Sequence, residues 1–213
     1  MDTDDMIIEE GIELVRLART SVESYIKNRK IINSTIKSNK KSGVFVTIYH
    51  LNTMNSQKNL RGCIGYMIPL KNMYDSVIAA AINAATKDPR FSAISERELA
   101  EVIFEVSVLT KPSLIRVDNS DVSLNKIVIG RDGLLLESAY GSGLFLPQVP
   151  VEQKWDIREY LTNLCYKAGA PPDTWLLPDS KLYTFHSIIF REKLPNREIS
   201  AENYKVNWEY GSS

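Results

Sequence analysis

Long hydrophobic runs are absent from this sequence, and so is an excess of charge of either sign. No apolar run approaches the roughly 20 residues that a membrane-spanning helix needs. Lys and Arg together number 26, and Asp and Glu also number 26, so no overall basic field would draw the chain onto nucleic acid or anionic lipid. The sequence therefore predicts a soluble protein without a membrane partner. Nucleic acid is a disfavoured partner, although a local patch in the lysine-rich stretch 27–41 leaves it open.

Thiols and imidazoles are equally scarce. The chain has two cysteines, Cys63 and Cys165, and two histidines, His50 and His186. Three of its first five residues are acidic, where a secretory signal would be basic, so we expect a cytoplasmic location, in which thiols stay reduced and a disulfide is the less favoured alternative. The spacing of the cysteines and histidines predicts no zinc site. Neither histidine has an identifiable acidic partner in the sequence, and we assign neither a role.

Apolar periodicity predicts an α+β fold, a mainly antiparallel sheet with flanking helices. Three segments carry apolar residues at helical spacing, and five are rich in β-branched and aromatic residues. A further hairpin is expected where residues 126–129 and 134–136 flank an Asp-Gly pair. The predicted helices are 4–28, 70–86 and 151–168, and the predicted strands are 43–49, 60–67, 102–110, 144–146 and 182–190.

The most unusual segment is the hexapeptide Leu60-Arg61-Gly62-Cys63-Ile64-Gly65. Glycine inside a strand often marks a close backbone approach, so Gly62 and Gly65 could admit a ligand whose anionic group Arg61 binds. A neighbouring cation would favour the thiolate of Cys63 as a nucleophile. The structural alternatives are that Cys63 is a small core residue and that Arg61 pairs with an internal carboxylate such as Asp88.

Other polar residues admit two interpretations each. Asp88 and Arg90 form either a fixed pair at the edge of a cleft or a turn that covers the carbonyl groups of a helix end. Glu105 is either a buried carboxylate of the kind that collects at functional sites or an outward-facing strand residue. Lys167 is more simply a solvated lysine at a helix end, and Cys165 lies on the apolar stripe of that helix, so we expect it in the core.

The hexapeptide resembles the signature of the AMMECR-type domain family, and other segments follow in the same order over about residues 5 to 195. This resemblance implies one domain over 1–213, with a smaller subdomain of about 40–85 inserted in a larger one of about 1–39 and 86–213. The matching segments are Asp88-x-Arg90-Phe91, Val106 to Thr110, Gly133, Leu146-Pro147-x-Val149 and Lys167-x-Gly169.

The resemblance leaves the biochemical activity open. It implies partner proteins of the radical-SAM-like and Memo-type kinds, and through them RNA or cofactor modification. Two functions follow: an enzyme or enzyme subunit that uses Cys63, or a binding or adaptor module that offers the same cleft between subdomains to a small molecule, nucleotide or protein. The ligand-binding candidates are Arg61, Gly62, Asp88, Arg90 and Glu105. No cofactor is identified, and no metal site is predicted.

Overall fold

The structure is a computed structural model that describes residues 8–36, 39–52, 57–68, 71–116 and 124–202. The described residues form two compact units. One contains the residues up to Thr110 together with Ile188–Glu202, and the other contains the residues from Lys111 to Ser187. The α+β class predicted from the sequence is confirmed. No helix in the described ranges is long and apolar enough to cross a membrane.

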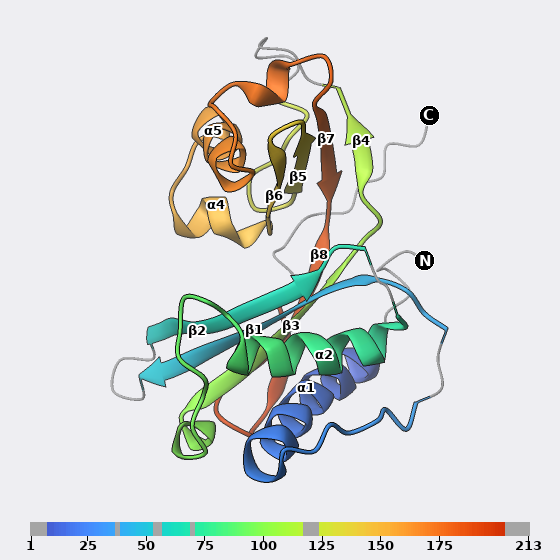
Figure 1. Cartoon of the computed structure of the whole chain (residues 1–213), viewed down its shortest axis with the longest axis vertical. Helices are drawn as coiled ribbons and strands as arrows, with labels where there is room; N and C mark the ends of the chain where they lie inside the picture. The colour runs from blue at the N-terminus through green and yellow to red at the C-terminus, as the bar shows by residue number, and fades with distance from the viewer. Residues whose placement is uncertain (1–7, 37–38, 53–56, 69–70, 117–123, 203–213) are drawn as a thin grey trace. The chain divides into compact units, whose positions relative to one another are not determined.

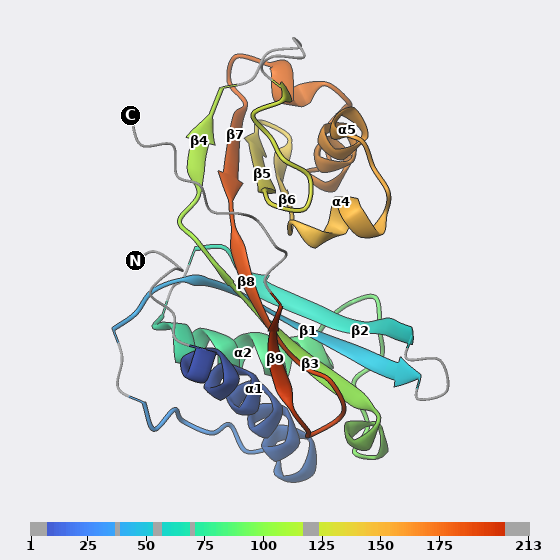
Figure 2. The same cartoon turned by 180° about the vertical axis from the view of Figure 1, so that it is seen from behind.

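The first unit is a sheet with two helices on one face (Figure 1), and its strand β1 pairs antiparallel with β2 and β3. Its strands follow the order β2-β1-β3-β8-β9, and Figure 2 shows β9 beside β8 at the edge opposite β2. Its elements are α1 (Ile8–Asn28), β1 (Gly43–Asn52), β2 (Gln57–Tyr66), α2 (Met73–Thr86), the short 3-10 helix η2 (Arg97–Ala100), β3 (Val102–Leu109), β8 (Ser187–Glu192) and β9 (Ile199–Glu202).

Alternation along the strands sends one set of side chains into the core of this unit. Because successive strand residues point to opposite faces, Val46 of β1 and Phe104 of β3 pack with Val77 of α2 and Leu14 of α1 in a single cluster. Thr47 and the residues on its face point away from the helices.

A buried arginine joins α1 to this sheet. Arg19 donates from Nε and Nη2 to the two carboxylate oxygens of Glu192, at 2.6 Å each. Its remaining donors bind the carbonyls of Leu99 at 3.1 Å and Val102 at 2.7 Å, and Glu23 at 3.3 Å. All five N–H groups of the guanidinium are therefore used, which explains how a helix can bury this charge.

The second unit is a smaller antiparallel sheet, in the order β4-β7-β5-β6, packed with α5. Cys165 is fully buried in this core, as predicted. Its elements are β4 (Ser113–Ile115), β5 (Gly133–Ser138), β6 (Gly141–Phe145), α4 (Gln148–Glu152), α5 (Ile157–Lys167), the 3-10 helix η3 (Thr174–Leu176) and β7 (Lys181–Phe185).

Three predicted elements of this region were wrong in detail. Residues 126–129 form turns and not a strand, because the Asp132 carboxylate accepts a hydrogen bond from Val128 N at 2.8 Å and holds a turn; the hairpin is formed by β5 and β6. The single helix predicted over 151–168 is two helices, α4, which ends at Glu152, and α5, which begins at Ile157, where Asp156 and Glu159 form a capping box. The predicted strand 182–190 is two strands, β7 and β8, in different sheets.

The two units do not follow the subdomain boundaries expected from the resemblance. Residues from Gly43 to His50 pair with β3, over most of the length of β1, and α2 shares its core with α1. The backbone hydrogen bonds of β1 are made to β3, so β1 must be part of the same sheet. The segment 40–85 therefore belongs to the first unit, and the inserted body is formed by residues from Lys111 to Ser187. The cleft expected between subdomains stays a prediction.

Candidate functional site

The hexapeptide lies on β2, at the edge of the first unit's sheet. Its pairing with β1 contains a β-bulge: Leu60 faces Tyr49 and Gly62 faces Ile48, so Arg61 has no opposite residue. A bulge bends the strand and re-aims a side chain. Arg61 and Cys63 therefore do not follow the simple alternation of a regular strand.

The two hexapeptide glycines make room for protein and not for a ligand. A Cβ at Gly62 would lie 2.2 Å from the carbonyl oxygen of Ala84, in the backbone of α2. A Cβ at Gly65 would lie 2.3 Å from the ring of Phe45 and 2.4 Å from the Val44 carbonyl oxygen. The open space inferred from the sequence is occupied by α2 and β1, which corrects the ligand interpretation of Gly62.

Asp88 connects this edge strand to the turn after α2. Its buried carboxylate accepts a hydrogen bond from Cys63 N at 2.8 Å. It also accepts two from the Arg90 side chain, at 2.9 Å from Nε and 2.7 Å from Nη2, and one from Arg90 N at 3.1 Å. The Arg90 guanidinium, with the two backbone donors, lowers the pKa of Asp88 to about 2. The fixed Asp88–Arg90 pair predicted from the sequence is thus present.

Arg61 has an internal carboxylate partner, although it is not Asp88. Its Nε donates to Glu98 Oε1 at 2.8 Å, and its Nη1 donates to the Ser92 carbonyl at 2.8 Å. Glu98 Oε2 accepts from Ser95 N and Ser95 Oγ, at 2.9 Å each. Burial alone would raise the pKa of Glu98, but the Arg61 and Ser95 hydrogen bonds lower it to about 2.

Phe91 brings the two arginines to one place. The guanidinium carbon of Arg61 lies 5.9 Å from the centre of the Phe91 ring and that of Arg90 lies 5.4 Å from it, both within cation–π range. The Arg90 side chain is 49% exposed, whereas the Asp88 side chain that holds it is 2% exposed. We name this group of Arg61, Asp88, Arg90, Phe91 and Glu98 the arginine site.

Cys63 lies beside the arginine site, in surroundings that favour its protonated thiol. Thr47 Oγ1 donates to Cys63 Sγ at 3.4 Å. Burial raises the pKa of the Cys63 thiol, and this outweighs the opposing effects of Thr47 and the more distant Arg90. Since the thiolate is the reactive form, the environment favours an inert thiol at neutral pH.

Glu105 is buried, so the interpretation of it as an outward-facing strand residue was wrong. Its carboxylate lies 2.8 Å from Arg191 Nε on β8, in an ion pair in which both side chains are largely buried. Through the pairs Thr47–Glu105 and Thr47–Cys63, it lies in the same row across the sheet as the thiol. Lys167 is exposed at the end of α5, with its Nζ 5.7 Å from the Phe145 ring.

Both histidines have acidic partners that the sequence did not reveal. His186 Nε2 lies 2.9 Å from Asp132 Oδ1, and His50 Nε2 lies 2.8 Å from Glu101 Oε2. Arg131 donates to both oxygens of Asp132, at 2.8 and 2.7 Å. Burial would raise the pKa of Asp132, but the bonds from His186 and Arg131 lower it. No group of three or more His, Cys, Asp or Glu among the described residues could hold a metal ion.

The fold and the arginine site together define an α+β protein of two units with a polar site on an edge strand. The family model AMMECR1 matches residues 15–190, and the chain belongs to this family. It is 44% identical to Protein MJ0810 of Methanocaldococcus jannaschii over 196 residues, which cover 91% of this chain and 96% of that protein. It is 47% identical to Protein TK0174 of Thermococcus kodakarensis, with 90% and 94% of the two chains covered.

A solved structure has the same fold. The crystal structure of an uncharacterized protein, PH0010 from Pyrococcus horikoshii, matches with a TM-score of 0.84 and 43% identity, over 91% of this chain and 97% of that one. The names of these relatives assign no specific function. A function must therefore be argued from the site.

Proposed function

We propose that this protein is a binding module, in which the arginine site recognises an anionic group of its partner. The observation that carries the proposal is Arg90: a buried carboxylate fixes two of its five N–H donors, and about half of its side chain remains exposed. A guanidinium held in one orientation loses little entropy on binding a carboxylate or phosphate.

The enzyme interpretation has weaker support from the same residues. Asp88 and Glu98 hold their protons too weakly for general-acid catalysis near neutral pH. Cys63 has the opposite problem, since its raised pKa disfavours the thiolate. Positioned donors without a reactive group suit recognition better than covalent chemistry.

The partner is a small molecule, a nucleotide or a protein that carries the anionic group; nucleic acid is not favoured. The radical-SAM-like and Memo-type proteins implied by the sequence resemblance, and a cytoplasmic location, belong to this proposal. In that setting the module would serve RNA or cofactor modification by holding a partner, without performing the reaction itself.

The test is a calorimetric titration with two probes, inorganic phosphate and adenosine monophosphate. Arg90→Lys keeps a cation beside Asp88 but loses the planar fork, so it should weaken binding of the better probe about tenfold. Arg97→Lys is the matched control, since Arg97 is exposed and lies outside the arginine site. Equal affinity in both variants and in the unmodified protein would contradict the proposal, as would no binding of either probe.

A further inference from the structure

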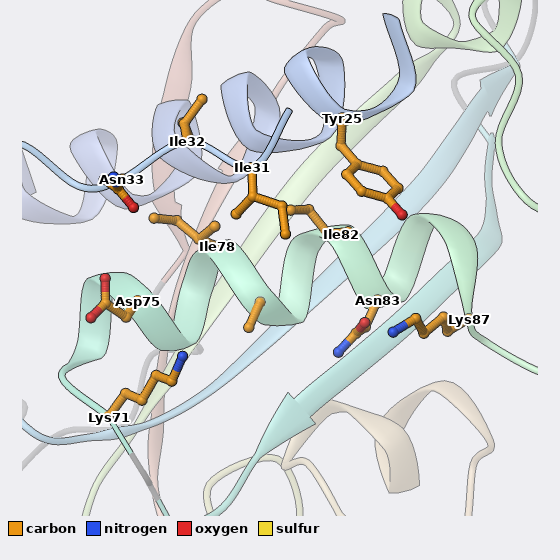
Figure 3. A pocket seen from close by; sticks show the side chains of 11 residues that line it. Tyr25, Ile31, Ile32, Asn33, Lys71, Asp75, Ile78, Ile82, Asn83 and Lys87 are labelled. Atoms are coloured by element: carbon orange, nitrogen blue, oxygen red, sulfur yellow. The ribbon is translucent and has the colours of Figure 1, made fainter. Parts of the chain in front are cut away.

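A pocket of about 340 Å³ lies on the side of α2 that faces the chain segment after α1. Figure 3 shows it between α2 and the extended residues Ile31 to Asn33, with Tyr25 closing one end. Its size falls at the lower end of the range for small-molecule sites. It is distinct from the arginine site, and none of the residues of that site lines it.

The lining residues of α2 follow one face of the helix. Asp75, Ile78, Ala79, Ile82 and Asn83 recur at intervals of three and four, so they form one stripe. From Ile78 to Lys87 the helix rises about 14 Å, at about 1.5 Å per residue. A ligand that follows this stripe must therefore be elongated.

The middle of the pocket is apolar. Ile78 and Ile82 form its floor, and Ile31 points toward them from the opposite side (Figure 3). Ile78 and Ile82 are only 5% and 6% exposed, whereas Ile31 is 62% exposed, so most of the apolar surface in the middle of the pocket belongs to Ile31. An apolar ligand body that packs against Ile31 would remove this surface from water.

The two ends of the pocket differ in charge. At one end, Lys71 lies with Asp75, the only carboxylate among the described residues that line the pocket. At the other end, Figure 3 shows Lys87 extending toward Asn83, with the Tyr25 hydroxyl directed to the same end. No carboxylate among the described lining residues accompanies Lys87 at this end, whereas Asp75 offsets the charge of Lys71 at the other. The Lys87 end therefore has the excess of positive charge.

Asn83 is held in place at this end. Its Nδ2 donates to the Tyr66 hydroxyl at 3.0 Å. This bond fixes the amide beside Lys87, whose ammonium is the one cation at this end among the lining residues that the structure describes.

We infer that this pocket binds an elongated amphipathic anion, with its carboxylate or phosphate at Lys87 and its apolar chain against Ile31. Decanoate is a suitable probe, because it combines a carboxylate with a linear hydrocarbon. Decanol is the matched neutral control, with the same chain and no charge.

The experiment is a titration of the full chain with decanoate, followed by calorimetry and by amide NMR shifts. Saturable binding with shifts at Ile31, Ala79 and Ile82 is expected, about tenfold weaker in Lys87→Gln and for decanol. Lys71→Gln is the matched variant, since it removes the same charge at the other end and should change affinity much less. Ala79→Leu should abolish binding by filling the pocket.

Lys87→Arg keeps the charge and should keep the affinity, which separates a lost cation from a disturbed fold. Absence of saturable decanoate binding would overturn the inference. Equal weakening by Lys71→Gln and Lys87→Gln, equally tight binding of decanol, or undiminished binding in Ala79→Leu would also overturn it.

Discussion

At the scale of single residues, the charged side chains of the arginine site are paired in two ion pairs. Asp88 holds Arg90 and Glu98 holds Arg61, and each pair combines a carboxylate with a planar guanidinium. The two arginines differ in exposure, at 14% for the side chain of Arg61 and 49% for that of Arg90. We therefore assign Arg61 chiefly to folding and Arg90 to recognition.

Replacing Arg61 tests this division. Arg61→Ala leaves the half-buried Glu98 without its cation and the Ser92 carbonyl without a donor, so the free energy of unfolding should fall by about 1–3 kcal/mol. Urea denaturation gives the value. Arg97→Ala serves as the control for loss of an exposed arginine, and an unchanged stability of Arg61→Ala would show that the Glu98 pair contributes little.

The thiol of Cys63 provides a second test. Because burial raises its pKa, alkylation by iodoacetamide should be slow at pH 7 compared with glutathione and should rise steeply above pH 9. Cys63→Ser gives the background from Cys165. A rate that is already at its plateau near pH 7 would mean a stabilised thiolate and would revive the enzyme interpretation.

The pH dependence of stability should report on Asp88. Its folded pKa of about 2 lies below the unfolded value of about 3.9, so ionised Asp88 stabilises the fold fully above about pH 4. This contribution is lost as the pH falls through the folded pKa. Asp88→Asn should therefore flatten the decline of stability between pH 4 and 2, measured by thermal melts.

Glu98→Gln is the comparison for that experiment, since Glu98 also has a pKa of about 2. The double variant should flatten the decline more than either single change. An acid-side slope that none of the three variants alters would assign acid unfolding to other carboxylates.

At the scale of elements, the sequence of β2 is constrained by how closely the backbone of α2 approaches it. Gly62, Asp88 and the bulge at Arg61 all lie where the strand meets the end of α2. The strand and helix could be predicted from the sequence because their signals are local. The reason that position 62 is a glycine could not be predicted, since Ala84 becomes the neighbour of Gly62 only after folding.

Gly62→Ala should be strongly destabilising. The added Cβ meets the backbone carbonyl of Ala84 at 2.2 Å, and a helix backbone cannot yield as a flexible side chain can, so we expect a loss of about 2–3 kcal/mol or more. Shortening Ala84 to glycine should not rescue the variant, because the obstructing atom is main chain. Rescue by Ala84→Gly would show that the approach is less tight.

Long-range pairs also mark the limit of sequence interpretation. The Asp88–Arg90 pair spans two residues and could be predicted. The Arg61–Glu98, His186–Asp132 and Arg19–Glu192 pairs span 37, 54 and 173 positions, so only the tertiary fold brings their members together. The hairpin predicted at 126–129 failed for a different, local reason, since the Asp132 side chain accepts a hydrogen bond from Val128 N and stabilises a turn that the apolar pattern does not reveal.

At the scale of the whole molecule, the chain is one unit with a second unit inserted in it. The chain passes from the first unit into β4 and returns through β7, and these strands pair with Ser113 opposite Thr184. Residues directly opposite in an antiparallel pair are about 5 Å apart. The two connections to the inserted unit are therefore adjacent.

This adjacency predicts that the second unit can be removed. Replacing residues 114–183 with an Asn-Gly turn joins two positions that already pair, and the first unit keeps its complete core cluster. We expect a soluble product with a single cooperative thermal transition by circular dichroism. Loss of cooperative unfolding would mean that the first unit depends on the second for its stability.

The most direct test of the account is the arginine side-chain NMR spectrum during a phosphate titration. We predict that the Nε–H signals of Arg61 and Arg90 exchange slowly with solvent in the free protein, because both donate to carboxylates. Phosphate should then shift the Arg90 signals while those of Arg61 and Arg97 change little. Arg90 signals that stay unchanged while phosphate shifts arginines elsewhere would contradict the assignment of the arginine site as the binding site.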